Sequence, residues 1–118
     1  MTLKECYTLF SGDYEDTVRR LAGEARARRF ALQFLADTNF SRLKTALRAG
    51  NRPEALRAAH SLKGLSLSLG FTNLGRSAAA LLHPLHTGIP DNAQELLERV
   101  AEEHRRVTAA LLALRGGC

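Results

Sequence analysis

Apolar residues recur at intervals of three and four along most of this chain, which is the spacing of one face of an α-helix. The clearest pattern predicts a helix over residues 53–69, whose inward face carries Ala55, Ala59, Leu62, Ser66 and Leu69. The same spacing predicts long helices over residues 24–49, 72–86 and 91–114, and shorter ones over residues 3–10 and 13–22. Within the first long stretch, residues 37–39 either interrupt the helix or bend it. The pattern therefore predicts an all-α protein.

Short turns join the four long stretches, and this favours an antiparallel up-and-down four-helix bundle with additional short N-terminal helices. A length of 118 residues favours a single domain over residues 1–118. We expect its bundle core at about residues 24–114 and a short helical extension at residues 1–22. Polar residues at the predicted helix starts are expected to act as N-caps: Asp13, Asn51, Thr72 and Asp91. Pro84 is expected to kink or fray the end of its helix.

Composition indicates where the protein is located and which kinds of partner it could bind. No apolar run reaches the roughly 18 residues needed to span a bilayer, and the first residues lack the layout of a signal peptide. We therefore expect a cytoplasmic protein. Cys6 and Cys118 have neither metal-site nor redox spacing, so we expect two free thiols. The net charge of +5 suits either an acidic protein surface or a nucleic acid as partner.

The stretch His60-Ser61-Leu62-Lys63-Gly64 is the main candidate for chemistry. On the helical wheel His60 falls about 160° from the centre of the inward face, so its ring should meet solvent. Lys63 follows three residues later and therefore lies beside the imidazole. A glycine inside a helix costs about 1 kcal/mol relative to alanine, so Gly64 must serve another purpose. A nucleophilic ring with a cation and open space beside it indicates a histidine that carries a phosphoryl group.

Acidic residues are absent between Glu54 and Asp91, an interval that contains Arg57, Lys63, Arg76 and three of the four histidines. This interval suits an added anion but offers no carboxylate for Mg²⁺, whose ligands are oxygens. The chain also lacks a glycine-rich phosphate loop. We therefore expect a phosphoryl carrier without kinase activity, metal site or cofactor of its own, and a partner that supplies the Mg²⁺.

Two leucines flank the histidine on the outward side of this helix. Leu56 and Leu67 lie one and two turns from His60, and Phe71 follows at the end of the helix. An exposed apolar group beside a reactive residue is typical of a docking surface. We therefore predict that Leu56, Leu67 and Phe71 bind the partner protein.

The sequence Ala58-Ala59-His60-Ser61-Leu62-Lys63-Gly64, followed by Leu69-Gly70, resembles the signature of histidine-containing phosphotransfer (HPt) domains, over about residues 24–113. The resemblance implies a four-helix bundle with His60 as the phosphorylated residue, Lys63 as the phosphate-side cation and Gly64 as the access residue. It also implies phosphorelay partners, namely the receiver domains of response regulators or hybrid histidine kinases in two-component signalling. Many members carry a glutamine or arginine late in the next helix, where His86 stands here as its substitute. A single exposed site suggests a monomer.

Other readings of the same residues remain open. A helical adaptor whose histidine is never phosphorylated would show the same helical pattern. The basic cluster Arg26, Arg28 and Arg29 would suit a nucleic-acid-binding protein, although no recognition-helix motif accompanies it. His83 and His86 are spaced to share a helix face, but no third metal ligand is apparent.

Overall fold

The computed structural model describes residues 1–117, and every regular element among them is a helix, which confirms the predicted all-α class. Along the chain the elements are α1 (Leu3–Leu9), α2 (Tyr14–Arg20), α3 (Glu24–Gln33), the short 3-10 helix η1 (Phe34–Ala36), α4 (Asn39–Arg48), α5 (Arg52–Ser68), α6 (Thr72–Leu85) and α7 (Ala93–Gly116).

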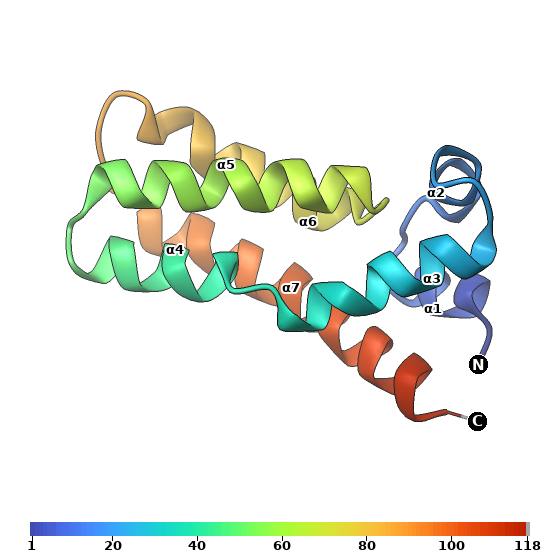
Figure 1. Ribbon diagram of the computed structural model, residues 1–118. Coiled ribbons are helices and arrows are strands. Elements are labelled where there is room, and N and C mark those ends of the chain that lie inside the picture. The colour runs from blue at the N-terminus through green and yellow to red at the C-terminus, as the bar shows by residue number, and fades with distance from the viewer. Residues whose placement is uncertain (118) are drawn as a thin grey trace.

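Helices α4 to α7 form a bundle in which each helix contacts the next, and α7 also contacts α4. In Figure 1 α5 and α6 lie along one side of the molecule, with α4 and α7 beneath them, and α1 to α3 gather at one end. The helix that carries His60 therefore packs between α4 and α6 and has one side left for solvent.

The first long helical stretch is interrupted rather than bent. Asp37 adopts an extended conformation (φ −68°, ψ 139°) between η1 and α4. Its carboxylate accepts hydrogen bonds from the backbone nitrogen of Asn39 at 3.0 Å and from Asn39 Nδ2 at 2.8 Å. These bonds stabilise the break, because a short acidic side chain competes well for backbone N–H groups just before a helix.

Two of the predicted helix caps are confirmed. Asp13 accepts from the backbone nitrogen of Asp16, and Asn51 accepts from that of Glu54, each at 3.2 Å. The caps predicted at Thr72 and Asp91 are wrong, because α6 is preceded by Phe71 and α7 by Asn92, and neither end has a side-chain cap. The residue before α6, Phe71, is buried in the core and has no side-chain oxygen that could accept from the helix N–H groups.

Pro84 lies in the last turn of α6. The helix ends one residue later, and the backbone nitrogens of His86 and Thr87 bond to the carbonyls of His83 and Pro84, three residues back. This tighter hydrogen-bond pattern is common where an α-helix ends.

A single hydrophobic core joins the short N-terminal helices to the bundle. Helix α1 contributes Leu3, Cys6 and Tyr7, each at most 2% exposed. The Tyr7 hydroxyl donates to the carbonyl of Leu69 at 2.6 Å, and the backbone nitrogen of Asp13 donates to the carbonyl of Gly70 at 2.9 Å. Residues 1–22 therefore complete the core at the corner between α5 and α6.

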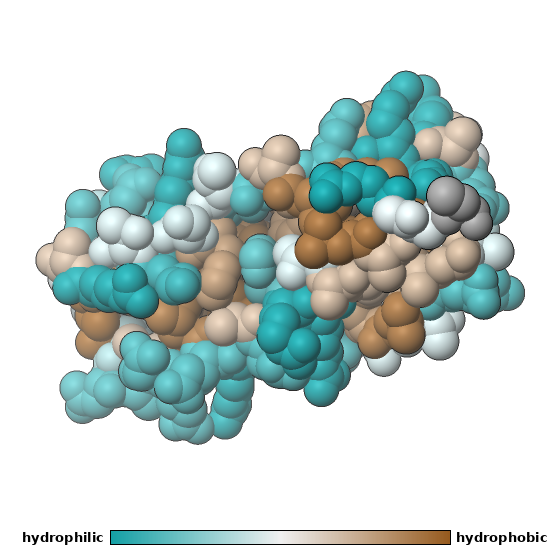
Figure 2. Space-filling view, turned by 90° about the horizontal axis from the view of Figure 1, so that it is seen from below, coloured by the Kyte–Doolittle hydropathy of each residue, from teal (hydrophilic) through white to brown (hydrophobic). Residues whose placement is uncertain are grey.

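On the face seen from below, a broad apolar area runs from the middle of the molecule toward the end where α1 to α3 gather, and hydrophilic side chains surround it (Figure 2). The exposed large apolar side chains of residues 1–117 are Met1, Leu9, Leu67, Ile89 and Leu112. None of the described helices is long and apolar enough to cross a bilayer.

Candidate functional site

Helix α5 presents His60 to solvent because its buried residues lie on the other side. Asn51 caps the helix and Pro53 lies in its first turn, where its missing N–H does no harm. The inward residues are Ala55, Ala58, Ala59, Leu62 and Ser66, all buried. The predicted exposure of His60 is confirmed, and its phosphorylation stays a prediction.

Open space adjoins the histidine on its own helix. A Cβ atom added at Gly64 would have no neighbouring atom within 4 Å, so the chain's own packing does not require this glycine. Lys63 is half-buried, and it takes part in none of the ion pairs found among residues 1–117. Its ammonium group is therefore available to an anion that reaches the ring of His60.

Arg57 lies one turn before the histidine and is paired with the last acidic residue ahead of the acid-free interval. Its Nη2 and Nε atoms lie 2.8 Å and 3.2 Å from Oε2 of Glu54. Arg57 is exposed, and Glu54 is partly buried. The site therefore holds a second cation, which is turned away from His60 in this state.

Of the three residues predicted to bind a partner protein, only Leu67 is exposed. Leu67 is 42% exposed and is the one exposed large apolar side chain on α5. It lies against α6, because a Cβ atom at Gly75 would come within 2.5 Å of Leu67 Cδ2. Leu56 is partly buried and packs against the core.

Phe71 corrects the prediction, because it is fully buried and cannot contact a partner protein. Gly70 turns the chain inward with a positive φ of 77°. The Phe71 ring then lies among Tyr7, Phe10 and Phe34, at centroid distances of 5.8, 5.2 and 5.1 Å. Aromatic rings at these separations attract one another beyond the gain from burial, which holds Phe71 in the core.

His86 is exposed at the end of α6, away from the middle of α5. Arg52 Nη1 donates to the carbonyl of Leu85 at 2.8 Å, so this end of α6 lies beside the first turn of α5. Arg52 precedes His60 by eight residues, which is about 12 Å of helical rise. The structure therefore does not bring His86 to the ring of His60. Among the described residues, no group of three or more metal-binding side chains joins His83 and His86.

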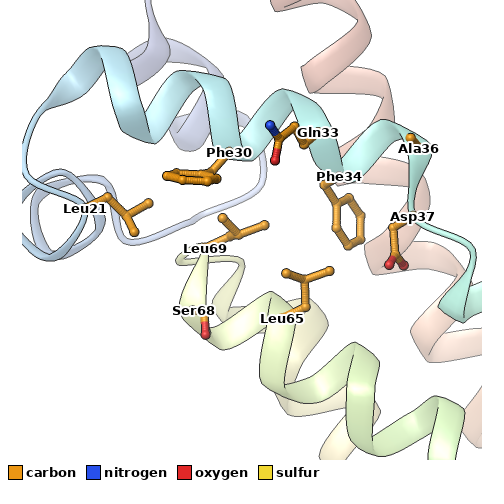
Figure 3. Close-up of a pocket in the computed structure, with 9 residues that line it drawn as sticks. All are labelled: Leu21, Phe30, Gln33, Phe34, Ala36, Asp37, Leu65, Ser68 and Leu69. Atoms are coloured by element: carbon orange, nitrogen blue, oxygen red, sulfur yellow. The ribbon is translucent and has the colours of Figure 1, made fainter.

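A cavity of about 430 Å³ opens on the other flank of α5, between its last turns and the segment formed by α3 and η1. Figure 3 shows Phe30 and Phe34 pointing from that segment toward Leu69 and Leu65. The full lining comprises Leu21, Phe30, Gln33, Phe34, Ala36, Asp37, Leu65, Ser68 and Leu69. The sequence pattern did not reveal this cavity, because its two walls are about 30 residues apart in sequence. The apolar residues of each wall show the same spacing as residues that face the core.

The histidine-bearing bundle matches a known family. The Hpt domain family matches residues 31–116, which include all of α4 to α7. The chain therefore belongs to the Hpt domain family, the histidine phosphotransfer modules of phosphorelays. Domains of this family are phosphoryl carriers rather than enzymes, and their partners are receiver domains. Neither a curated protein nor a solved structure matches the chain.

Proposed function

We propose that this protein is a phosphorelay shuttle in which His60 accepts a phosphoryl group from the phosphoaspartate of one receiver domain and passes it to another. The observation that supports this most directly is the exposed ring of His60 in the middle of α5, with Lys63 and the open position of Gly64 beside it. A second protein must bring its phosphorylated side chain within bonding distance, and only an exposed ring permits that approach.

The unprotonated nitrogen of the neutral imidazole attacks the phosphorus atom of the acyl phosphate. The nitrogen–phosphorus bond forms as the bond between phosphorus and the aspartyl oxygen breaks, and the aspartate leaves as a carboxylate with the bonding electrons. The other ring nitrogen keeps its proton. Phosphoryl transfer depends mainly on positioning and charge compensation, and Lys63 would offset the charge of the group on His60. We expect the receiver to supply the Mg²⁺.

The partner would dock across the exposed side of α5. Leu67 and the exposed part of Leu56 lie on one flank of His60, and the apolar cavity lies on the other flank. Leu65 and Ser68, which line that cavity, follow Gly64 by one and four residues on the same helix. The net charge of +5 favours the approach of an acidic receiver site. We expect the chain to be a monomer that binds one receiver domain at a time.

The antiparallel four-helix topology is part of the same proposal. Short turns between consecutive helices and the contact of α4 with α7 support it, because these contacts close the ring of four. This arrangement would leave the middle of α5 accessible and hold it straight.

The test replaces His60 with glutamine and offers each protein to a phosphorylated receiver. The unsubstituted chain should give a ³¹P signal of phosphohistidine and lose it in acid, whereas the His60→Gln protein should take up no phosphate while keeping its helical circular dichroism. His83→Gln is the matched control, because it removes an exposed histidine from α6. Equal uptake by His60→Gln and the unsubstituted chain, or no uptake by either, would contradict the proposal; the latter is what an adaptor predicts.

A further inference from the structure

Two cations lie at equal sequence distances from His60 on α5. Arg57 precedes it by three residues and Lys63 follows it by three, and residues at this spacing are neighbours on a helix surface. At about 100° per residue, the two side chains leave the helix about 60° to either side of the imidazole. A group bound to the ring would therefore have Lys63 on one side and, once Arg57 leaves Glu54, a guanidinium on the other.

Arg57 is held away from the ring by Glu54 in the unphosphorylated protein. Both of its hydrogen bonds go to one oxygen of that carboxylate, at 2.8 Å and 3.2 Å. The side chains of the pair are 69% and 38% exposed. Ion pairs in this position on a helix contribute little to stability, so little free energy opposes their exchange for a stronger partner.

The surroundings of the pair allow Arg57 to leave it. A polar pocket of about 190 Å³ lies between α4 and α5, and its lining comprises Asn39, Arg42, Glu54, Arg57, Ala58 and Ser61. Arg42 shares this pocket with Glu54, so the carboxylate keeps a cation nearby after Arg57 has moved.

We propose that Arg57 exchanges Glu54 for the phosphoryl group when His60 is phosphorylated, so that Glu54 and Arg57 together set the stability of the phosphorylated state. This inference rests on the proposed phosphorylation of His60. A phosphoryl group carries more negative charge than a carboxylate and offers three acceptor oxygens, so it competes well for a guanidinium.

The exchange predicts opposite effects for the two partners of the ion pair. Arg57→Gln removes the phosphoryl contact, whereas Glu54→Gln frees Arg57 to make it. The quantity to measure is the equilibrium constant for phosphoryl transfer from a phosphorylated receiver to His60, corrected for any complex between the two proteins. This constant reflects the stability of the free phosphorylated chain, whereas a purely docking role of Arg57 would change only the transfer rate and the binding affinity.

We expect Arg57→Gln to lower the equilibrium constant by roughly two- to fivefold and Glu54→Gln to raise it by a similar factor, the scale of an exposed ion pair. The double variant should behave like Arg57→Gln, because Glu54 acts only through Arg57. Arg57→Lys, which keeps the charge, should recover part of the loss. These differences should shrink at high salt, where exposed charges are screened.

Glu95→Gln and Arg99→Gln are matched controls, because they break an exposed ion pair of 2.9 Å on α7 and should leave the constant unchanged. Circular dichroism on each variant shows that it is folded. The inference is overturned if His60 takes up phosphate but the two substitutions shift the constant in the same direction or not at all. A change in transfer rate alone also overturns it, since Arg57 would then act in docking. No uptake by the unsubstituted chain overturns both the proposed function and this inference.

Discussion

The hydroxyl of Tyr7 donates a 2.6 Å hydrogen bond to the backbone carbonyl of Leu69, which joins α1 to the end of α5 across 62 residues of sequence. Both residues are buried. Burial raises the pKa of Tyr7 far above its usual range, so its hydroxyl stays protonated and able to donate. The helix that carries His60 is therefore anchored at its C-terminal end by the N-terminal helices.

Tyr7→Phe should destabilise the fold by about 1–3 kcal/mol, because it leaves the buried carbonyl of Leu69 without this donor. Urea denaturation followed by circular dichroism measures the change in the free energy of unfolding. Tyr14→Phe is the matched control, since the Tyr14 hydroxyl bonds an exposed carboxylate of Glu24. Equal decreases in the free energy of unfolding would mean that the buried hydrogen bond stabilises the fold no more than the exposed one.

Gly70→Ala should cost about 2–4 kcal/mol, from left-handed strain and overpacking together. The φ of Gly70 is +77°, and an added Cβ would overlap Thr17 Oγ1 and lie 2.8 Å from the carbonyl oxygen of Asp13. Gly50→Ala separates the two causes, because Gly50 also has a positive φ (+66°) but has open space around it. Thermal or urea unfolding of both variants measures the difference, and equal costs would rule out the steric contribution.

Gly64→Ala should stabilise the protein and impair its proposed function. Alanine gains roughly 0.5–1 kcal/mol over glycine inside a helix, and nothing in the chain lies near the added methyl group. The same methyl group would stand where a partner's phosphoryl oxygens approach His60. Unfolding experiments should show higher stability, and the rate of phosphoryl uptake from a receiver should fall. An unchanged rate would mean that Gly64 provides no access.

Because the pKa of His104 is lowered in the folded protein, we expect the free energy of unfolding to fall on mild acidification. Its ring stacks on Phe40 at 4.5 Å, and burial lowers its pKa below the usual value, with Lys44 lowering it further and Asp37 opposing both. In the unfolded chain the imidazole takes up a proton as the pH falls through about 6.5, whereas in the folded chain it does so only at lower pH. The free energy of unfolding should therefore decrease from pH 7 toward pH 5.

His104→Gln should flatten this dependence, and urea denaturation at several pH values measures the slope. His83→Gln, on the exposed face of α6, is the matched control and should leave the slope unchanged. A slope that survives in His104→Gln would assign the acid sensitivity to other groups.

The sequence predicted the orientation of α5 well because the phase of a long amphipathic helix depends on its own residues. The exposure of His60 and the caps at Asp13 and Asn51 are local properties of this kind. The ion pair of Glu54 and Arg57 could also have been predicted from the sequence, since residues at this spacing share a helix face.

The direction of Phe71 could not be predicted in the same way. It depends on the left-handed turn at Gly70 and on rings supplied by α1 and η1, which are remote in sequence. The apolar cavity beside Leu65 likewise exists only because α3 crosses the end of α5. Tertiary contacts of this type leave no periodic signal in a single sequence.

The match to the Hpt domain family begins at residue 31, yet the ring of Phe71 packs against Tyr7 and Phe10, and the carbonyl of Leu69 accepts a hydrogen bond from Tyr7. A fusion protein that contained only residues 31–116 would expose an apolar surface at the end of the helix that carries His60, and such a surface favours aggregation. The segment that folds as one unit is longer than the segment that matches the family, so residues 1–30 should be kept in any such fusion.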